Sequence, residues 1–587
     1  MKLPINLPNK GFTLIEIVLG IFIIAFISFF IFNIFQNINR VTLGGRLTLQ
    51  LLSLLQDEME KIRVLNYEDI GIQGGWPPGV LPREKIINKN GLEVKINFYI
   101  RNIDDSRDGT ITSTPRDTAP ADYKLVEIEG EILNSPLRIK KQTLYALIAP
   151  KTVEAITRNG SMFVQVIDAE GKPIKDARIK VDYLNEPQFT IQDVTDVWGV
   201  LRLIDIPTGI NAYAIYVTKE GYSSERTYQK GEEYPNPVIP YQTVRSGELT
   251  TVTFQIDLLS KLKIKTQNIF CKSIPNVLFN LQGIKLINTD PPISKTNITT
   301  TTNENGEKEL DIEFDSYFLK ISDLRYVLNS SLPFLEDPFN VEPNKIYSYT
   351  LTLKNNSPKN LLVSVFDEAG NLIEGANVNL FKGNNLIATQ KTGEEIYFED
   401  DWSSGKYSSL SLGIDPQTFP GEVQLKDLGG FYSTSTEWLI SKEIDFGTFN
   451  INYKKFSWSG NLPAGTSIKF QLASNNDNST WNFVGPDGTS NTYFETQEFI
   501  IPSFLQNKRY LRYKIYLQTN DPLISPSLDK ISISFSSACF SSGETLFQNL
   551  SPGEYYLEVI KEGYFFYTAT TTISDENFYH EKVILTR

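Results

Sequence analysis

The chain has 587 residues, of which 41% are hydrophobic, 21% charged and 12% aromatic, and its net charge is −13. This is a globular composition with room for about four or five domains, and its acidic balance argues against general nucleic-acid binding, because phosphate affinity comes from Lys and Arg. The single histidine, His580, and the two cysteines, Cys271 and Cys539, exclude HExxH-type zinc sites and every CxxC-based site.

The N-terminus combines a short polar leader, residues 1–11, with a long apolar segment. Residues 12–35 read FTLIEIVLGIFIIAFISFFIFNIF, and their only polar side chains are those of Thr13, Glu16, Ser28 and Asn33. As a helix this segment is about 36 Å long, enough to cross a bilayer core of about 30 Å. The leader carries Lys2 and Lys10, which predicts that it stays cytoplasmic while the rest of the chain lies outside.

A carboxylate inside the apolar segment argues against a plain signal anchor, which is the alternative interpretation. A charge in a spanning helix is costly and usually marks a function, and no small-residue cleavage site of the secretory kind follows the segment. The run KGFTLIE, from Lys10 to Glu16, resembles the class III signal of type IV prepilins and pseudopilins. The resemblance implies cleavage between Gly11 and Phe12 by a prepilin peptidase, N-methylation of Phe12, and a fibre-assembly role for Glu16.

The helix is expected to span residues 12–66, because six apolar side chains between residues 47 and 62 recur at helical spacing. Residues 67–157 are predicted to form a small head, with strands at 92–100 and 123–132. Between these strands lies a run of aspartates similar to that of pseudopilin heads, some of which hold calcium. The calcium ligands considered are Asp104, Asp105 and Asp108, and a solvated turn is the alternative.

The tail contains an internal repeat. The pattern Asp-x-x-Gly occurs at 168–171 and at 367–370, and the tetrapeptide KEGY occurs at 219–222 and at 561–564. This pattern resembles the carboxypeptidase regulatory-like module, a transthyretin-like β-sandwich. The resemblance implies one repeat at 158–258, a divergent repeat at 259–356, and a third repeat that is split into 357–400 and 538–587.

Spacing places a further domain inside the third repeat. Ala177 and Gly221 are 44 residues apart, whereas Ala376 and Gly563 are 187 apart, an excess of 143 residues. That excess is the size of one domain, and a β-sandwich of jelly-roll type is predicted at 401–537. Such sandwiches often bind sugars. The insert's large aromatic side chains either stack on a pyranose or fill the core: Trp438, Trp458, Trp481 and Tyr493.

The two cysteines lie in different repeats of the tail. Cys271 is near the start of the middle repeat, and Cys539 begins the second half of the split repeat. Outside the cytoplasm disulfides persist, so a bridge between these residues would lock adjacent repeats together. Two buried free thiols are the alternative.

The expected fold class is α+β: a transmembrane and stem helix with a pilin-like head, followed by a mainly-β tail of sandwiches. The expected function is that of a minor type IV pilin or pseudopilin-like subunit displaying a stalk for adhesion or ligand binding. A minor pseudopilin of a type II secretion or DNA-uptake machine and a membrane-anchored carbohydrate-binding protein are the alternatives. No recognisable catalytic pair is present, so no enzyme is expected.

These expectations define the partners and the location. The partners would be a prepilin peptidase, other pilin or pseudopilin subunits, an inner-membrane assembly platform and a surface ligand, with a glycan as one option. No cofactor besides calcium is expected. The chain would be a single-pass membrane protein before assembly and part of a surface pilus or pseudopilus afterwards.

Overall fold

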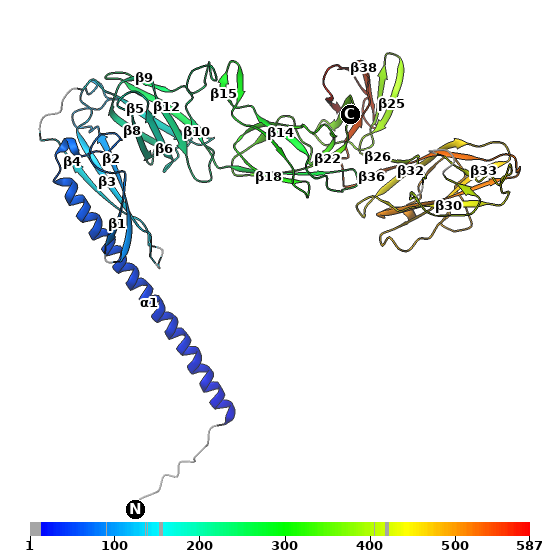
Figure 1. The fold of residues 1–587 in the computed structure, drawn as a ribbon, viewed down its shortest axis with the longest axis horizontal. Coiled ribbons are helices and arrows are strands. Elements are labelled where there is room, and N and C mark those ends of the chain that lie inside the picture. The colour runs from blue at the N-terminus through cyan, green and yellow to red at the C-terminus, as the bar shows by residue number, and fades with distance from the viewer. Residues whose placement is uncertain are drawn as a thin grey trace, which may run out of the picture. The chain divides into compact units, whose positions relative to one another are not determined.

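The computed structural model describes residues 13–89, 91–135, 137, 139–151, 157–403, 405–416 and 422–587. The chain divides into two compact units, one comprising Met1–Leu258 with Leu286–Ile293 and the other Leu259–Lys285 with Ser294–Arg587. One long helix is followed by β-sheets throughout (Figure 1). The fold class is therefore α+β, as the sequence predicts.

The first unit begins with α1 (Leu14–Arg63), a continuous helix of 50 residues. Its first half is exposed, whereas its second half buries one apolar stripe against the head. The stripe consists of the residues that recur at helical spacing in the sequence, namely Leu47, Leu51, Leu54, Leu55, Met59 and Ile62. A short 3-10 helix, η1 (Tyr67–Asp69), follows.

The head is a four-stranded antiparallel sheet in the order β1-β2-β3-β4. Its strands are β1 (Glu84–Lys89), β2 (Leu92–Ile103), β3 (Tyr123–Ile132) and β4 (Gln142–Ile148). Alternate residues of β2 and β3 are buried and pack with the α1 stripe in one core, as strand periodicity requires. Gly130 allows the close approach, since a Cβ there would lie 2.8 Å from Leu51 and Leu55.

A β-sandwich completes the first unit. One sheet has the order β12-β5-β8, and the other has the order β10-β9-β6-β7, with β11 paired to β9. The strands are β5 (Gly160–Ile167), β6 (Arg178–Tyr183), β7 (Phe189–Val194), β8 (Val200–Ile206), β9 (Gly209–Thr218), β10 (Glu225–Arg226), β11 (Gln242–Val244) and β12 (Leu249–Gln255). Trp76 of the head joins this sandwich: its Nε1 donates to the Asp205 carbonyl at 2.9 Å, and its ring packs against Phe189.

The second unit starts with the middle sandwich, whose two sheets have the orders β18-β13-β22-β20 and β17-β14-β19-β21. A small hairpin, β15-β16, lies between β14 and β17 in the chain, and most of it, Leu286–Ile293, belongs to the first unit. The strands are β13 (Ser260–Gln267), β14 (Leu278–Gly283), β15 (Leu286–Thr289), β16 (Pro292–Ser294), β17 (Asn297–Thr301), β18 (Glu307–Ile312), β19 (Asp315–Ile321), β20 (Tyr326–Leu332), β21 (Phe339–Val341) and β22 (Ile346–Asn355).

The next sandwich is built from two segments that are distant in sequence. Its sheets have the orders β37-β23-β40 and β25-β24-β38-β39, so β23 and β24 pair with strands that follow residue 540. The strands are β23 (Asn360–Asp367), β24 (Asn377–Lys382), β25 (Asn385–Lys391), β37 (Glu544–Phe547), β38 (Gly553–Ile560), β39 (Tyr567–Ile573) and β40 (Phe578–Leu585). We call it the split sandwich.

The insert between these segments forms a further sandwich with its own core. One sheet contains β28-β29-β36-β32-β34 with β26 on β36, and the other contains β27-β30-β35-β31 with β33 on β35. The strands are β26 (Glu395–Glu399), β27 (Tyr407–Leu410), β28 (Ile414–Asp415), β29 (Val423–Leu425), β30 (Glu437–Ser441), β31 (Ile444–Asp445), β32 (Asn452–Asn461), β33 (Thr466–Asn475), β34 (Glu498–Ile500), β35 (Tyr510–Thr519) and β36 (Ser527–Ser536), with η2 (Ser503–Leu505).

The insert begins earlier than the sequence spacing suggests. β26 pairs with β36, from Glu395↔Phe535 to Glu399↔Ile531, so the insert's sheet starts at residue 395 and not at residue 401. The spacing of sequence motifs gives the length of an insertion. It does not show which strand is the first to pair with the insert's sheet instead of the split sandwich. Because β26 and β36 are paired neighbours, the two ends of the insert lie about 5 Å apart.

Removing residues 395–536 and joining the ends with a short Gly-Ser turn should leave the split sandwich folded, because every strand of its two sheets is retained. Phe270 and Phe540 would lose their packing against the insert core, at a cost of about 1.5–3 kcal/mol each. We expect a lower Tm by calorimetry with the Cys271–Cys539 bond still formed. Loss of cooperative unfolding, or free thiols at Cys271 and Cys539, would contradict the conclusion that the insert is a separate domain within the split sandwich.

Candidate functional sites

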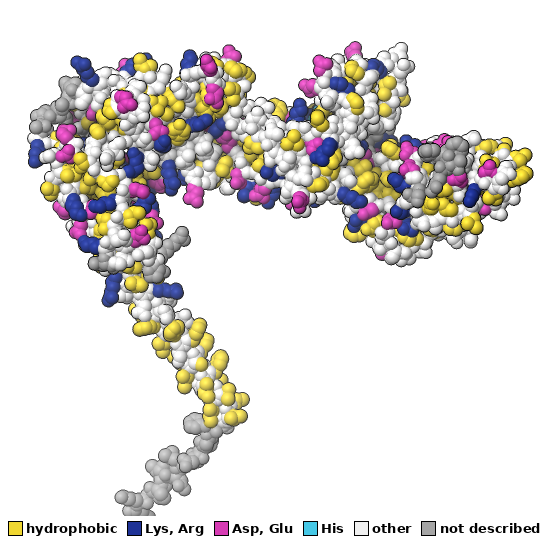
Figure 2. Space-filling view, in the orientation of Figure 1, with side chains coloured by type: hydrophobic (Ala, Val, Ile, Leu, Met, Phe, Trp, Pro, Cys, Tyr) yellow, Lys and Arg dark blue, Asp and Glu magenta, His cyan; other side chains and the backbone are white. Residues whose placement is uncertain are grey.

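The exposed half of α1 is a candidate membrane segment. Within the described residues, α1 is the one helix long and apolar enough to cross a membrane, with a mean hydropathy of 2.9 in its most apolar window and none of that window buried. Figure 2 shows hydrophobic side chains gathered along this half of the helix. Side chains such as Phe22 and Phe35 are 66% and 60% exposed. This helix is therefore a candidate membrane anchor or signal.

Glu16 lies in the first turn of α1 and forms a capping box with Thr13. Its Oε2 accepts hydrogen bonds from the Thr13 backbone N–H at 2.9 Å and from Thr13 Oγ1 at 2.8 Å. A carboxylate at this position satisfies free N–H groups and complements the positive end of the helix dipole. Gly11 and Phe12, the predicted processing residues, lie outside the described residues, so their processing and the fibre-assembly role of Glu16 stay predictions.

Three aspartates converge in the head, and they are not the three that their sequence proximity suggests. Carboxylate oxygens of Asp104, Asp117 and Asp122 lie within 4.8 Å of one another. Asp108 is exposed, and Asp105 contributes its backbone N–H to Asp122 Oδ2. Asp104 is thus joined by Asp117 and Asp122, because the chain turns back on itself between β2 and β3. Calcium binding by Asp105 and Asp108 stays a prediction.

The cluster has the chemistry of a hard-cation site. Asp104 Oδ1 and Asp117 Oδ2 are buried and have no hydrogen-bond partner in the described part of the chain, while Asp104 Oδ2 accepts from the Ile111 N–H at 2.9 Å. Burial raises the pKa of Asp104 to about 6, and the charges of Asp117 and Asp122 add to the effect. A Ca²⁺ ion takes six to eight oxygen ligands, so three carboxylates fit as the anionic part of such a set.

The raised pKa of Asp104 predicts how the head responds to pH and calcium. Without calcium, the stability from this carboxyl is present below its ordinary pKa near 3.8 and is lost as the pH rises through about 6. We therefore expect the Tm to be a few degrees higher at pH 5 than at pH 7 in a chelator. Calcium binds the ionised form and should raise the Tm at pH 7.

Two variants distinguish calcium binding by the cluster from nonspecific attraction of calcium to the acidic surface. Asp104→Asn should remove both the calcium response and the pH dependence, whereas Asp108→Asn, which changes an exposed neighbour, should keep both. Isothermal titration with calcium and thermal scans at the two pH values measure these effects. A calcium response that survives Asp104→Asn would rule out this cluster as the ligand set.

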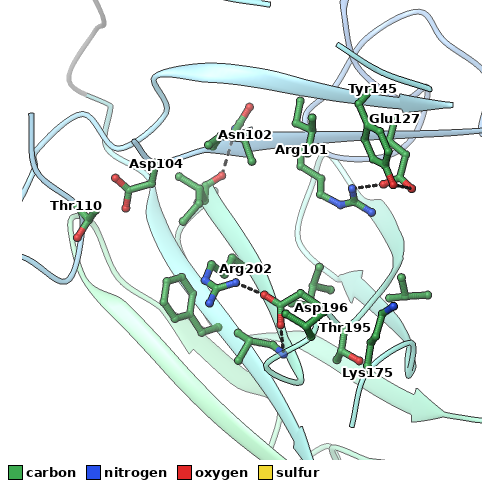
Figure 3. A pocket seen from close by; sticks show the side chains of 18 of the residues that line it. Arg101, Asn102, Asp104, Thr110, Glu127, Tyr145, Lys175, Thr195, Asp196 and Arg202 are labelled. Carbon is green, nitrogen blue, oxygen red and sulfur yellow. Dashed lines mark hydrogen bonds and ion pairs between the residues drawn. The ribbon is translucent and has the colours of Figure 1, made fainter. Parts of the chain in front are cut away.

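A cavity of about 680 Å³ lies between the head and the first sandwich. Figure 3 shows Arg101 with Glu127 on one side and Arg202 with Asp196 on the other. Burial alone would lower the pKa of Arg101, but its ion pairs with Asp193 and Glu127 raise it above the usual value. Lys175 also has a carboxylate neighbour, Asp176, at 3.7 Å. The cavity is thus a polar junction in which the cations of its lining are already paired.

His580 is buried beside a serine and a carboxylate. Its Nε2 lies 2.8 Å from Ser364 Oγ, and Ser364 Oγ donates to Glu544 Oε1 at 3.1 Å. Burial lowers the pKa of His580 to about 4 and raises that of Glu544 to about 7. A hydrolytic triad needs the carboxylate on the imidazole and an accessible serine. Here the carboxylate contacts the serine, which is buried, so the three groups form a structural network that the sequence did not reveal.

The two cysteines form a disulfide, with an S–S distance of 2.03 Å and a Cα–Cα distance of 5.0 Å. Cys271 lies in the turn after β13, and Cys539 lies between β36 and β37. The bridge therefore connects the middle sandwich to the segment in which the chain returns from the insert to the split sandwich.

The insert's aromatic residues divide between its core and its surface. Trp458 is 5% exposed and belongs to the core, where its Nε1 donates to the Thr496 carbonyl. Trp438, Trp481 and Tyr493 are half-buried. Trp438 lies on the outer side of the β30-β35-β33 sheet, because its neighbour Leu439 points into the core. Trp481 and Tyr493 lie in the segment between β33 and β34 and contact outward-facing residues of β35, Arg512 and Tyr516. The core interpretation is thus right for Trp458 only.

A row of rings and cations crosses this outer side, which we call the aromatic face: Trp438, Lys469, Tyr493, Lys514 and Tyr516. Trp438 is directly opposite Tyr516, and Tyr516 is directly opposite Lys469. The Tyr493 and Tyr516 ring centroids are 4.9 Å apart, and Lys514 Nζ lies 4.7 Å from the Trp438 ring. Burial lowers the pKa of Lys514, which makes no ion pair within the described residues.

No protein-family model matches the chain, and no curated protein matches it either. Among solved structures, it is similar to the Bacillus anthracis TIE protein (11% identity, 86% of this chain, 72% of that chain, TM-score 0.15). It is also similar to a streptococcal ancillary pilin (10% identity, 73% of this chain, 99% of that chain, TM-score 0.15). A third similar structure is the shaft pilin SpaA of Lactobacillus rhamnosus GG (9% identity, 34% of this chain, 99% of that chain, TM-score 0.13). At such TM-scores the likeness carries no argument about fold or function.

Proposed function

We propose that the chain is a minor type IV pilin or pseudopilin-like subunit that displays its β-sandwich tail at the cell surface. The observation that carries the proposal is the two-part character of α1. Its first half is apolar all round, exposed, and begins with a carboxylate in the first turn, while its second half is buried on one face against a four-stranded sheet. Such a helix suits a subunit that waits in a bilayer and then packs its stem against other stems.

The tail supports a minor rather than a major role. The described part of residues 158–587 forms four sandwiches beyond the head, and a fibre that packs stems side by side crowds its heads around the axis. Tails of this size on every subunit would collide, whereas a sparse or terminal subunit can carry one. A secretion or DNA-uptake pseudopilus would use the same stem, and in each case the proposed partners are a prepilin peptidase, other subunits and an assembly platform.

We propose a binding or structural role for the tail rather than catalysis. The buried Ser364, His580 and Glu544 network places its carboxylate on the wrong partner for a hydrolytic relay. The cations around the cavity of the first unit are paired with carboxylates. Neither arrangement offers an activated nucleophile to a substrate.

The stem proposal is tested by Glu16→Val with Asn33→Leu as the matched control. Both remove a polar group from the apolar half of α1, but Asn33 donates to the Phe29 carbonyl of its own helix. If Glu16 pairs with a neighbour's α-amine, its loss should cost about 3–5 kcal/mol per contact. We expect normal membrane insertion of both variants and loss of fibre incorporation for Glu16→Val alone.

The readouts are membrane fractionation, immunogold labelling of fibres and N-terminal sequencing after co-expression with a prepilin peptidase. Sequencing should find Phe12 as the first residue, and labels should be isolated rather than dense along the shaft. Normal incorporation of Glu16→Val, or a mature chain that begins elsewhere, would contradict the proposal.

Glycan binding by the insert is a second candidate function, and the aromatic face favours it. Half-buried rings beside an unpaired lysine can pack on the apolar face of a sugar and bind an acidic substituent. Trp438→Ala should weaken binding several-fold, since one ring contact is worth about 1 kcal/mol. Phe398→Ala is the matched control, because Phe398 also lies under a lysine, Lys530, but on the opposite sheet.

Binding is measured by glycan-array screening followed by titration with the best glycan, including uronic-acid polymers. Equal glycan affinity of Trp438→Ala and the unmodified chain would show that the aromatic face is not the glycan-binding surface. Equal weakening by both variants would indicate a loss of insert stability instead of a lost contact.

A further inference from the structure

A lysine and an asparagine share one face of the middle sandwich where it meets the insert. β20 and β22 are antiparallel neighbours, with Val327↔Lys354 and Leu328↔Leu353 in register, followed by a bulge before Ser330↔Thr352. Asn329 is the extra residue of that bulge, two positions from the residue opposite Lys354. Diagonal neighbours of this kind are about 7–8 Å apart at their Cα atoms, within reach of a long side chain.

A third strand brings a carboxylate between them. Glu395, the first residue of β26, has its Oε2 at 2.6 Å from Lys354 Nζ, while its Oε1 accepts a hydrogen bond from Asn329 Nδ2 at 2.7 Å. The Glu395 side chain is 8% exposed, that of Lys354 26%, and Asn329 as a residue 2%. One buried carboxylate thus contacts both an amine and the nitrogen of a primary amide.

In this arrangement the side-chain oxygen of Asn329 lacks a hydrogen-bond donor among the described residues. Asn329 Oδ1 is buried and has no hydrogen-bond partner in the described part of the chain, and leaving such an acceptor unpaired costs about 1–3 kcal/mol. Glu395 cannot satisfy it while ionised, because a carboxylate only accepts hydrogen bonds. A protonated Glu395 would be able to donate to it.

We propose that Lys354 and Asn329 are joined by an intramolecular isopeptide bond, with Glu395 as the proton carrier. Glu395 takes a proton from the Lys354 ammonium, and the neutral Nζ attacks Cγ of Asn329. The Cγ–Nδ2 bond breaks and Nδ2 leaves as ammonia, taking the second proton from Nζ. The products are a secondary amide, ammonia and a neutral Glu395 carboxyl group, so atoms and charge balance without an oxidant or a cofactor.

The surroundings supply what this reaction needs. Holding the two groups together replaces a bimolecular encounter by an intramolecular one, which is worth several kcal/mol of barrier, and a carboxylate within hydrogen-bond distance of both nitrogens can move the proton. The neutral Glu395 left at the end is able to donate its hydrogen to Asn329 Oδ1. The orphaned acceptor of the unlinked chain is thereby satisfied in the product.

The bond would lie where the chain leaves the middle sandwich, since Lys354 is the penultimate residue of β22 and β23 begins at Asn360. It would join β22 covalently to β20. A tensile force applied to the split sandwich would reach the middle sandwich at this end of β22. The Cys271–Cys539 disulfide is a second covalent connection of the middle sandwich toward the split sandwich. The inference concerns the tail alone and does not depend on the proposed pilin role.

Trypsin digestion and mass spectrometry test the bond directly. The full chain, extracted in detergent, reduced and alkylated, is cleaved after Arg325, Lys345 and Lys359, but trypsin does not cleave after an acylated Lys354. We expect residues 326–345 and 346–359 as one branched product, lighter than the two peptides combined by one ammonia. Separate peptides 326–345 and 346–354 from the unmodified chain would overturn the proposal.

Two variants test the role of the carboxylate. Glu395→Gln keeps the shape but cannot accept the proton, so the branched product should disappear. Glu394→Gln changes the adjacent carboxylate, which lies near Lys391 instead, and should retain the product. A formed Cys271–Cys539 disulfide in each variant checks that the unit has folded. Retention of the branched product in Glu395→Gln would overturn the assignment of Glu395 as the proton carrier.

Discussion

The apolar side chains that surround the first half of α1 impose the constraint on which the rest of the molecule depends. They cannot remain in water, because each large apolar side chain gains about 1.5–3 kcal/mol on burial, and the described chain provides no surface that covers them. After Gly44 the helix changes character and carries a single stripe that one sheet can cover. The head therefore begins where the environment of the helix changes.

The sandwiches of the second unit are held together by polar and covalent contacts as well as by their cores. Glu544 accepts from the Ser331 backbone of the middle sandwich and from Ser364 of the split sandwich. Glu395 connects Lys354 and Asn329 to the insert, and the disulfide links Cys271 to Cys539. Buried carboxylates are costly unless partnered, so these contacts favour one relative arrangement of the sandwiches within this unit.

The sequence predicted the features that follow from periodicity and missed those that follow from loop closure. Helical spacing identified Leu51, Leu55 and the rest of the stem stripe, and the two KEGY copies led to the insertion inside one repeat. The β26 boundary was missed because pairing partners do not show in spacing. Asp117 and Asp122 reach Asp104 only through the fold, so the spacing of the aspartates in the sequence did not show that these three carboxylates converge.

The lysines of the tail show how local partners give one residue type different roles. Lys354 lies against Glu395 at a junction between sandwiches, where its charge is compensated and its nitrogen is held beside an amide. Lys514 lies on the aromatic face between Trp438 and Tyr516, where no carboxylate of the described chain compensates it. A desolvated cation of the second kind gains most from an anion supplied by another molecule. The tail thus separates the residues that hold its sandwiches together from those able to bind a ligand.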